Sequence, residues 1–407
     1  MKVLEYCENE VITLDSEMIK AAKEIKSLNP DLPFTINNQR LVFNEYTVGS
    51  ILLLDTLINI KPRNDVFDLK KIFEMILFNH GIFNDNSSYE YDYSDSGIDV
   101  VFTYFLSHCR KLVNFGLTGG FKVYEECSNT IKGEIVFEKF LEKNIPIKGI
   151  YYKKQEYTLN IPANQIIKKA LVKLSRSIHS YSSYDLGTIL RNFDEIDEYN
   201  GTYLDYISNH KYFFSSNPYY SETIDIAITI LKDMKLSFSN GQLKGYSFLH
   251  NSNDLFEEFV RKIVQQVSNI NAVKWDIPKS YASISYHDKT SEKKYCPDIV
   301  VGYDPSRETA HVVLDVKNKH FNPECGNISD LISSPDMYQI LFYCRKLKCA
   351  LGGLIYPTGQ SFSPVSVVVN DEKDLRLVLF SLNMNLPLPK RMEKLKKELY
   401  EFLYNYI

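Results

Sequence analysis

Two aspartates and a lysine in the C-terminal part of the chain have the types and spacing that could hold a metal ion beside a phosphate. Asp298 follows a proline, sixteen residues separate it from Asp315, and Lys317 comes two positions later. Residues two apart on a strand share a face, so Asp315 and Lys317 point the same way. Two carboxylates in one place repel unless a cation lies between them, and Mg²⁺ prefers oxygen ligands. Such an ion activates water against a phosphodiester, while a lysine stabilises the developing charge.

The residues around these side chains predict the strands that position them. The runs 299–301 and 312–316 are rich in β-branched residues, which favour strands. The polar segment 304–309 contains a proline at a good turn position, so the two runs predict a β-hairpin. The hairpin would bring Asp298 to the face that carries Asp315. These short motifs are also compatible with an ordinary solvent-exposed β-hairpin that has no catalytic role.

A helix and a further strand complete the predicted core. Ser334 is expected to cap a helix with a proline in its first turn, and Gln339 and Tyr343 lie four apart on one face of it. An apolar strand from 350 to 356 follows. Strand, turn, strand, helix and strand in this order predict an α/β core with a mixed sheet.

These residues resemble the PD-(D/E)xK nuclease superfamily, and more narrowly the McrC family, the nuclease subunits of McrBC-type modification-dependent restriction systems. The resemblance spans most of residues 40–400 and is dense from about 250 to 357. Glu134 stands where the family usually has arginine, so no role is carried to it. The strings that carry the resemblance are Pro297–Ile299, Leu314–Lys317, Asp336–Tyr343, Gly353–Pro357, Ile131–Phe137 and Ala163–Lys168.

The resemblance implies a restriction-endonuclease-like C-terminal core, a mixed sheet flanked by helices, with an α+β N-terminal region. It implies Mg²⁺ as cofactor, with Mn²⁺ able to substitute, held by Asp298, Asp315 and the backbone carbonyl of Val316. It also implies an acid on the helix before the core strands, where Glu257 and Glu258 are the candidates. A solvated acid at a helix start explains either glutamate equally well.

The resemblance assigns the remaining roles and the partners. Lys317 would stabilise or position the attacking water and the phosphate, and Gln339 and Tyr343 would orient the site or contact the DNA backbone. The substrate would be modified double-stranded DNA. The partner would be a McrB-like AAA+ GTPase ring, into which the N-terminal region docks to stimulate GTP hydrolysis.

The composition of the chain limits which partners, cellular compartments and activities are possible. The chain has 407 residues and a net charge of −4, so a partner is expected to supply most of the DNA affinity. Several lysines lie close in sequence to the candidate site. They could form a patch that faces the phosphates of DNA, or they could be solvated lysines at the rim of the domain. The seven cysteines form no C-x-x-C pair, which favours a reducing cytoplasm. The apolar run 48–60 contains Asp55 and is too short to span a membrane. No phosphate-cradling glycine loop is present, so the chain itself should not hydrolyse nucleotides.

Three regions are predicted: a partner-docking α+β region at 1–160, a helical linking region at 161–244 and a nuclease domain at 245–407. The stretch 84–97 is predicted to be a loop. Strands are predicted within 46–60 and at 122–126, 130–137 and 150–157, and helices at 17–28, 66–78, 98–114, 164–179, 183–192, 222–234, 254–264 and 391–406.

The sequence therefore predicts a Mg²⁺-dependent DNA endonuclease subunit activated by an AAA+ GTPase. Two alternatives remain open. A stand-alone restriction endonuclease would cut DNA without partner or GTP. A non-catalytic adaptor that anchors a DNA motor would have no need of Asp298, Asp315 and Lys317 together, and should bind no Mg²⁺ or Mn²⁺ there.

Overall fold

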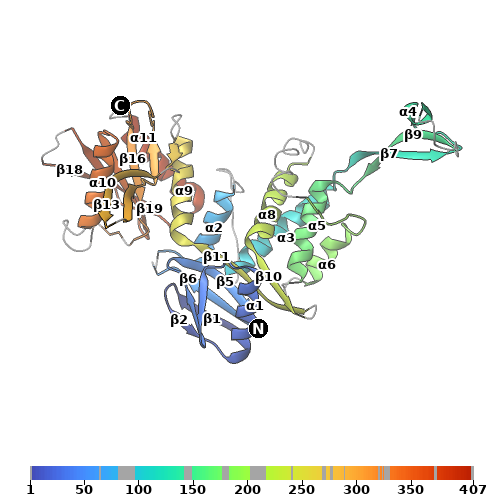
Figure 1. Cartoon of the computed structure of the whole chain (residues 1–407), viewed down its shortest axis with the longest axis horizontal. Coiled ribbons are helices and arrows are strands. Elements are labelled where there is room, and N and C mark those ends of the chain that lie inside the picture. The colour runs from blue at the N-terminus through green and yellow to red at the C-terminus, as the bar shows by residue number, and fades with distance from the viewer. Residues whose placement is uncertain are drawn as a thin grey trace. The chain divides into compact units, whose positions relative to one another are not determined.

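The computed structural model describes residues 2–63, 66–80, 97–141, 149–176, 183–201, 217–239, 242–267, 272–275, 278–287, 289–319, 321–322, 324, 331–370 and 374–404. Contacts divide the chain into two compact units, which are shown in Figure 1. The first joins Met1–Val100 to Ser247–Ile407, and the second is Val101–Tyr246. This division differs from the three predicted regions, because the first hundred residues make their contacts with the C-terminal part. The docking, linking and nuclease roles of those regions stay predictions.

The N-terminal part of the first unit contains two sheets and two helices. One sheet has the order β1-β6-β5-β11, in which β11 contributes its last residues, and the other has the order β2-β4-β3. Asp15 caps α1 by accepting from the backbone N–H groups of Glu17 and Met18, which confirms the predicted helix there. The elements are β1 (Lys2–Cys7), β2 (Val11–Thr13), α1 (Ser16–Leu28), β3 (Phe34–Asn37), β4 (Arg40–Phe43), β5 (Thr47–Leu53), β6 (Thr56–Lys61), α2 (Leu69–Asn79) and β11 (Gln242–Asn251).

The apolar run 48–60 forms the paired strands β5 and β6, which are buried over almost their whole length. The predicted strands are therefore confirmed. None of the helices in the described part of the chain combines the length and apolarity needed to span a bilayer.

The C-terminal part of the first unit is built on a mixed sheet of order β12-β15-β16-β17-β19-β18. Strands β15 and β16 pair antiparallel and confirm the predicted hairpin, whereas β16–β17 and β17–β19 pair parallel. The elements are α9 (Ser252–Val267), β12 (Ala272–Lys274), β13 (Lys279–Tyr286), β14 (Lys289–Tyr295), β15 (Ile299–Val301), β16 (Val312–Val316), α10 (Ser334–Lys346), β17 (Leu351–Thr358), β18 (Val365–Val368), β19 (Arg376–Asn383) and α11 (Leu388–Tyr404).

Helices cover both faces of this sheet. Val313 of β16 shares an apolar cluster with Ile340 and Cys344 of α10. Phe380 of β19 points to the opposite face, where its ring lies 5.3 Å from that of Phe402 in α11. Asp315 is two residues from Val313, so it lies on the face that α10 covers. Helix α11 begins three residues before its predicted start, and residues 405–407 lie outside the described part.

Helix α10 begins at Ser334, the predicted cap, so its observed cap lies one residue earlier. The cap is Ser333, whose side chain accepts from the N–H of Asp336, and the proline at 335 lies in the first turn. Gly352 lets this helix approach β17 closely. A Cβ atom there would lie 2.7 Å from the Cys344 sulfur and 2.6 Å from a Leu377 methyl. The glycine therefore helps to set the distance between the sheet and the helix that carries Gln339 and Tyr343.

The second unit contains a group of helices and a long antiparallel hairpin, in which β7 pairs with β9 (Figure 1). The predicted strand 130–137 is wrong in length, because only Glu134 and Ile135 pair with β9. The predicted loop 84–97 lies outside the described residues, except that Gly97 begins α3. The elements are α3 (Gly97–Phe115), β7 (Gly120–Ser128), β8 (Glu134–Ile135), α4 (Glu138–Leu141), β9 (Ile150–Thr158), α5 (Pro162–Ser175), α6 (Ser183–Arg191), α8 (Tyr219–Asp233) and β10 (Lys235–Ser239).

Replacing Gly352 by alanine tests this close packing. We expect Gly352→Ala to lower the free energy of unfolding by about 1–3 kcal/mol, because the added methyl overlaps buried atoms of α10 and β19. Gly187→Ala is the matched control, since a Cβ atom there meets nothing within 4 Å and alanine favours the helix. Urea unfolding followed by circular dichroism measures both. Equal stability of the two variants would contradict the packing argument.

Candidate active site

Asp315 and Lys317 lie at the end of β16 and face the same way, as their spacing predicts. The Asp315 side chain is 1% exposed, and its Oδ2 lies 2.5 Å from the Lys317 Nζ. The backbone N–H of Lys317 donates to the carbonyl of Ile355 at 2.9 Å, so the residue is held at the edge of β17. The backbone of Lys317 is therefore held in place by β17, and its ammonium group points back toward the Asp315 carboxylate.

Asp298 lies immediately before β15 and reaches the same place from the neighbouring strand. Its Oδ2 accepts a hydrogen bond of 2.7 Å from the backbone N–H of Val316. Burial, and then the nearby negative charge of Asp315, raise the pKa of Asp298 to about 8. The hairpin thus brings the two carboxylates together, as predicted. The contact seen at Val316 is made by its N–H, and the metal-binding role of its carbonyl stays a prediction.

The electrostatics of the pair favour a positive charge. Burial raises the pKa of Asp315, and the Lys317 ammonium opposes that rise. Burial alone would lower the pKa of Lys317, but the surrounding carboxylates, Asp315 first, leave it raised. The Oδ1 atom of Asp315 is buried and has no hydrogen-bond partner of its own among the described residues. One lysine therefore neutralises only part of the charge that two ionised aspartates would carry.

Gln339 and Tyr343 of α10 extend this arrangement. The Lys317 ammonium donates to Gln339 Oε1 at 2.8 Å, Gln339 Nε2 donates to the Tyr343 hydroxyl at 2.8 Å, and that hydroxyl donates to the carbonyl of Cys296 at 3.3 Å. Burial raises the pKa of Tyr343, so the hydroxyl keeps its proton. The chain of bonds connects the lysine to the segment that leads into Asp298.

The two candidate glutamates of α9 face different surroundings. The Glu258 carboxylate lies 3.6 Å from Arg261 and 3.6 Å from Lys262, in ion pairs along the helix. Glu257 acts on the site instead, because its negative charge adds to burial and to Asp315 in raising the pKa of Asp298. Of the two glutamates, Glu257 is therefore the one whose charge acts on Asp298, and its metal-binding role stays a prediction.

Asp336 is a site residue that the sequence did not reveal. It is buried, it accepts from the Lys319 ammonium at 2.9 and 2.8 Å, and its Oδ1 lies 3.7 Å from the Lys317 Nζ. Burial would raise its pKa, but hydrogen bonds from Lys319 and Ser333 hold it below the usual range. An acid in the first turn of a helix is ordinary, so only its contact with the D-x-K lysine identifies it.

Asn318 connects the site to α9. Its side-chain amide donates to Asn253 Oδ1 at 2.8 Å and to Ser252 Oγ at 3.2 Å. These two residues open the helix that carries Glu257, so the end of β16 and the start of α9 hold each other in place. The sequence offered no signal for this contact, because 65 residues separate Asn318 from Asn253.

The lysines near the site have different roles. Lys279 is engaged, since its ammonium donates to Glu308 and to the Tyr303 hydroxyl at 2.7 Å each and lies over the Trp275 ring. It is therefore a structural cation and not a phosphate-facing one. Lys289 and Lys293 are exposed on the β13–β14 hairpin.

The pair of aspartates is a sufficient donor set for Mg²⁺. Within the described residues no group of three or more His, Cys, Asp or Glu side chains is placed to hold a metal ion. Mg²⁺ commonly uses one or two protein carboxylates and completes its shell with water. Two adjacent carboxyl groups, that of Asp315 buried and that of Asp298 partly buried, fit that requirement.

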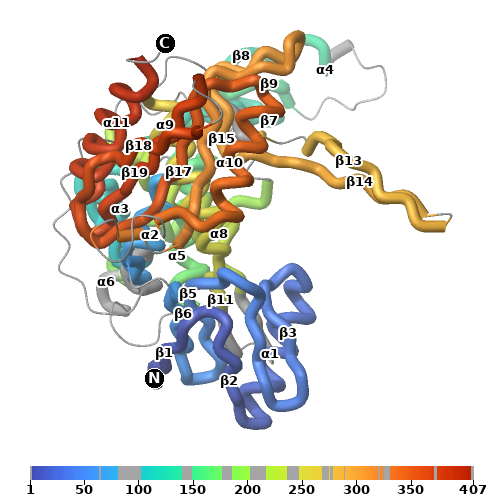
Figure 2. The backbone as a smooth tube through the Cα atoms, turned by 90° about the vertical axis from the view of Figure 1, so that its left-hand side faces the viewer, coloured from blue at the N-terminus to red at the C-terminus, as the bar shows by residue number. Residues whose placement is uncertain are grey.

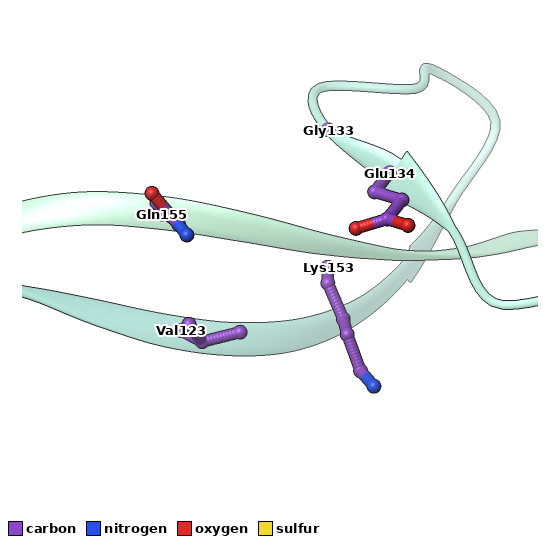
Figure 3. A pocket seen from close by; sticks show the side chains of 5 residues that line it. All are labelled: Val123, Gly133, Glu134, Lys153 and Gln155. Carbon is purple, nitrogen blue, oxygen red and sulfur yellow. The ribbon is translucent and has the colours of Figure 1, made fainter.

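A hollow on the hairpin of the second unit is a poorer place for such chemistry. It is lined by Val123, Gly133, Glu134, Lys153 and Gln155, whose side chains Figure 3 shows. It offers one carboxylate, and the Lys153 ammonium lies 3.5 Å from Glu125. No second acid lines the hollow, so it cannot reproduce the aspartate pair.

Comparison with known proteins places the chain in a family. Residues 43–357 match the family described as McrBC 5-methylcytosine restriction system component. The fold resembles a chain in the half-complex of Thermococcus gammatolerans McrB AAA+ hexamers with bound McrC, with a TM-score of 0.60, 14% identity and coverage of 98% of this chain and 99% of that one. A chain of the Thermococcus gammatolerans McrBC complex matches with a TM-score of 0.47, 15% identity and coverage of 65% and 88%. No curated protein matches. Because the family match covers most of the chain, this protein belongs to the McrBC family and resembles its McrC-type subunit.

Proposed function

We propose that the chain is the DNA endonuclease subunit of a McrBC-like modification-dependent restriction system and hydrolyses phosphodiester bonds with Mg²⁺. The observation that carries this proposal is the pairing of the buried Asp315 with the partly buried Asp298, with Lys317 Nζ 2.5 Å from Asp315. A binding module gains nothing from burying two like charges, since doing so costs stability. A hydrolase gains a place for a divalent cation next to a fixed ammonium.

Asp298 and Asp315 would hold the Mg²⁺ ion, with Mn²⁺ as a substitute. When bound, the ion supplies Lewis acidity to the phosphate and a more acidic water. The hydrogen bond from Val316 N–H orients the Asp298 carboxylate. The negative charge of Glu257 also raises the pKa of Asp298, and this glutamate would attract the ion directly or through water.

Lys317 would stabilise the negative charge that develops on the phosphate and position the attacking water. Its ammonium is oriented by Asp315 and Gln339, and Asp336 lies 3.7 Å away. Such preorganised charges are effective because they need no rearrangement during the reaction. Gln339 and Tyr343 act mainly by holding this lysine relative to Asp298.

The proposed partner is a McrB-like AAA+ GTPase ring, and the β7–β9 hairpin of the second unit is the proposed docking element. Phe121 and Phe137 are 73% and 72% exposed there, within the predicted docking region 1–160. Exposed aromatic side chains of this kind are typical of protein interfaces. Docking would couple GTP hydrolysis by the ring to cleavage of modified double-stranded DNA.

Asp315→Asn tests the nuclease assignment. We expect cleavage to fall by roughly a thousandfold or more, because the variant loses several kcal/mol of transition-state stabilisation through the metal. Cleavage of methylated and unmethylated plasmid is measured with Mg²⁺, with and without the AAA+ partner and GTP. Asp31→Asn, an exposed aspartate, is the control. Wild-type cutting by Asp315→Asn would refute the site, and cutting by the chain alone would indicate a stand-alone enzyme.

Metal binding should depend on pH. Because the pKa of Asp298 is raised to about 8, the carboxyl carries a proton below that pH, and a cation must displace it. We expect the affinity for Mn²⁺ to rise about tenfold per pH unit up to about pH 8 and then level off. Calorimetry in buffers of different ionisation enthalpy measures affinity and proton release. Asp298→Asn should lose this dependence, and a pH-independent affinity of the wild type would contradict the assignment.

Phe137→Ser tests the docking element. Loss of an exposed aromatic anchor should weaken binding to the AAA+ ring by about tenfold or more, while Mn²⁺ binding stays unchanged. Val368→Ser is the matched control, since Val368 is 82% exposed on β18 of the other unit. Binding is measured by surface plasmon resonance on the assembled ring. Equal weakening by both variants, or by neither, would exclude this hairpin as the specific docking site.

A further inference from the structure

The β13–β14 hairpin is a two-stranded arm that projects from the sheet of its unit (Figure 2). Almost every residue along both strands is exposed, and only Tyr295, at the base, is buried. A two-stranded ribbon buries too little surface to be stable alone in water. Its strands of eight and seven residues correspond to roughly 25 Å of reach.

One face of the arm combines lysines with exposed apolar side chains. The register places Tyr286 opposite Lys289, Ile284 opposite Ser291 and Ala282 opposite Lys293, and partners in an antiparallel pair share a face. Tyr286 is 73% exposed and Ile284 is 51% exposed. Among the described residues of this face none is acidic.

The other face of the arm differs in charge. Glu292 is paired with Ser283 there, next to the Ser285–Thr290 pair. This face also carries Lys294, which is paired with Ser280, so one lysine and one acid offset each other there, whereas the first face carries two lysines. A ribbon with this division of charge complements an anionic partner on one side only.

The base of the arm is fixed relative to the candidate site. The Tyr281 ring lies 4.9 Å from that of Phe342 in α10, and the Tyr295 ring packs against Trp275 and Tyr343. Tyr343 belongs to the hydrogen-bond chain that ends at Lys317, and Asp298 follows Tyr295 by three residues. The direction of the arm is thus set by side chains that also hold the site.

From these observations we infer that the basic face of the arm, comprising Ala282, Ile284, Tyr286, Lys289, Ser291 and Lys293, contacts duplex DNA beside the cleavage site. This inference rests on the proposed function and adds the surface that positions the substrate. A two-stranded ribbon fits the major groove of B-DNA. The lysines neutralise phosphates, and Tyr286 and Ile284 contact the sugars and bases between them.

A protein partner is the competing occupant, and the composition of the face disfavours it. Lysine is depleted in protein–protein interfaces, whereas DNA-binding surfaces are strongly basic. The chain as a whole carries a net charge of −4, so a surface whose described residues include no acid is where an anionic polymer meets less repulsion.

The test is binding of the full chain to a fluorescein-labelled 30-base-pair duplex, followed by fluorescence anisotropy in EDTA over a range of salt concentrations. We expect the Lys289→Gln/Lys293→Gln variant to bind roughly tenfold more weakly and to reduce the slope of log affinity against log salt by about two. Tyr286→Ala should weaken binding severalfold without changing the slope. Lys20→Gln/Lys23→Gln removes the same charge from the exposed face of α1 and should bind like the wild type.

The outcomes separate the arm from the nuclease assignment. Weaker binding by the arm variants supports the inference, whether or not cleavage depends on Asp315. Unchanged affinity and slope would overturn it, even if Asp315-dependent cleavage were established. A wild-type chain that binds no duplex would also overturn it. Unchanged duplex binding with a changed oligomeric state, measured by analytical ultracentrifugation, would instead make the arm a protein contact. Thermal melting checks that each variant is folded.

Discussion

The juxtaposition of the Asp298 and Asp315 carboxyl groups is the interaction on which the surrounding structure depends. Burial and mutual charge raise the pKa of Asp298, and Lys317 offsets only part of the negative charge. The strands before and after these residues place them side by side, and α10 supplies the side chains that hold the lysine. A divalent cation would displace the proton that Asp298 holds and neutralise both carboxylates, which is the physical basis of the proposed hydrolase.

Three contacts hold the scaffold around Asp298 and Asp315 in place. Gly352 lets α10 lie against β17, and the Gln339–Tyr343 pair then spans from Lys317 to the segment before Asp298. Asn318 ties the same strand end to the first turn of α9, whose Glu257 acts on Asp298. Three elements from different parts of the chain therefore fix one small region, as preorganised catalysis requires.

Two hairpins extend the chain's surfaces in different ways. The β7–β9 hairpin of the second unit presents exposed aromatic side chains, which suits a protein partner. The β13–β14 arm of the first unit presents lysines with a tyrosine and an isoleucine, which suits a nucleic acid. Lys153 and Lys154 of the β7–β9 hairpin pair with glutamates, whereas Lys289 and Lys293 give one face of the arm a positive charge that would attract phosphates. The proposed division of work between ring binding and DNA positioning thus has a basis in side-chain chemistry.

The sequence by itself determined the features that depend on neighbouring residues. The alternation along a strand placed Asp315 and Lys317 on one face, and the helical period placed Gln339 and Tyr343 on another. Only the tertiary structure brought Asp336 to Lys317, engaged Lys279 with Glu308, and joined the first hundred residues to the C-terminal unit. The residues in those contacts are far apart in the sequence, and no helical or strand periodicity relates them. The contacts therefore depend on how the folded elements pack and on their charges, which a local sequence pattern does not contain.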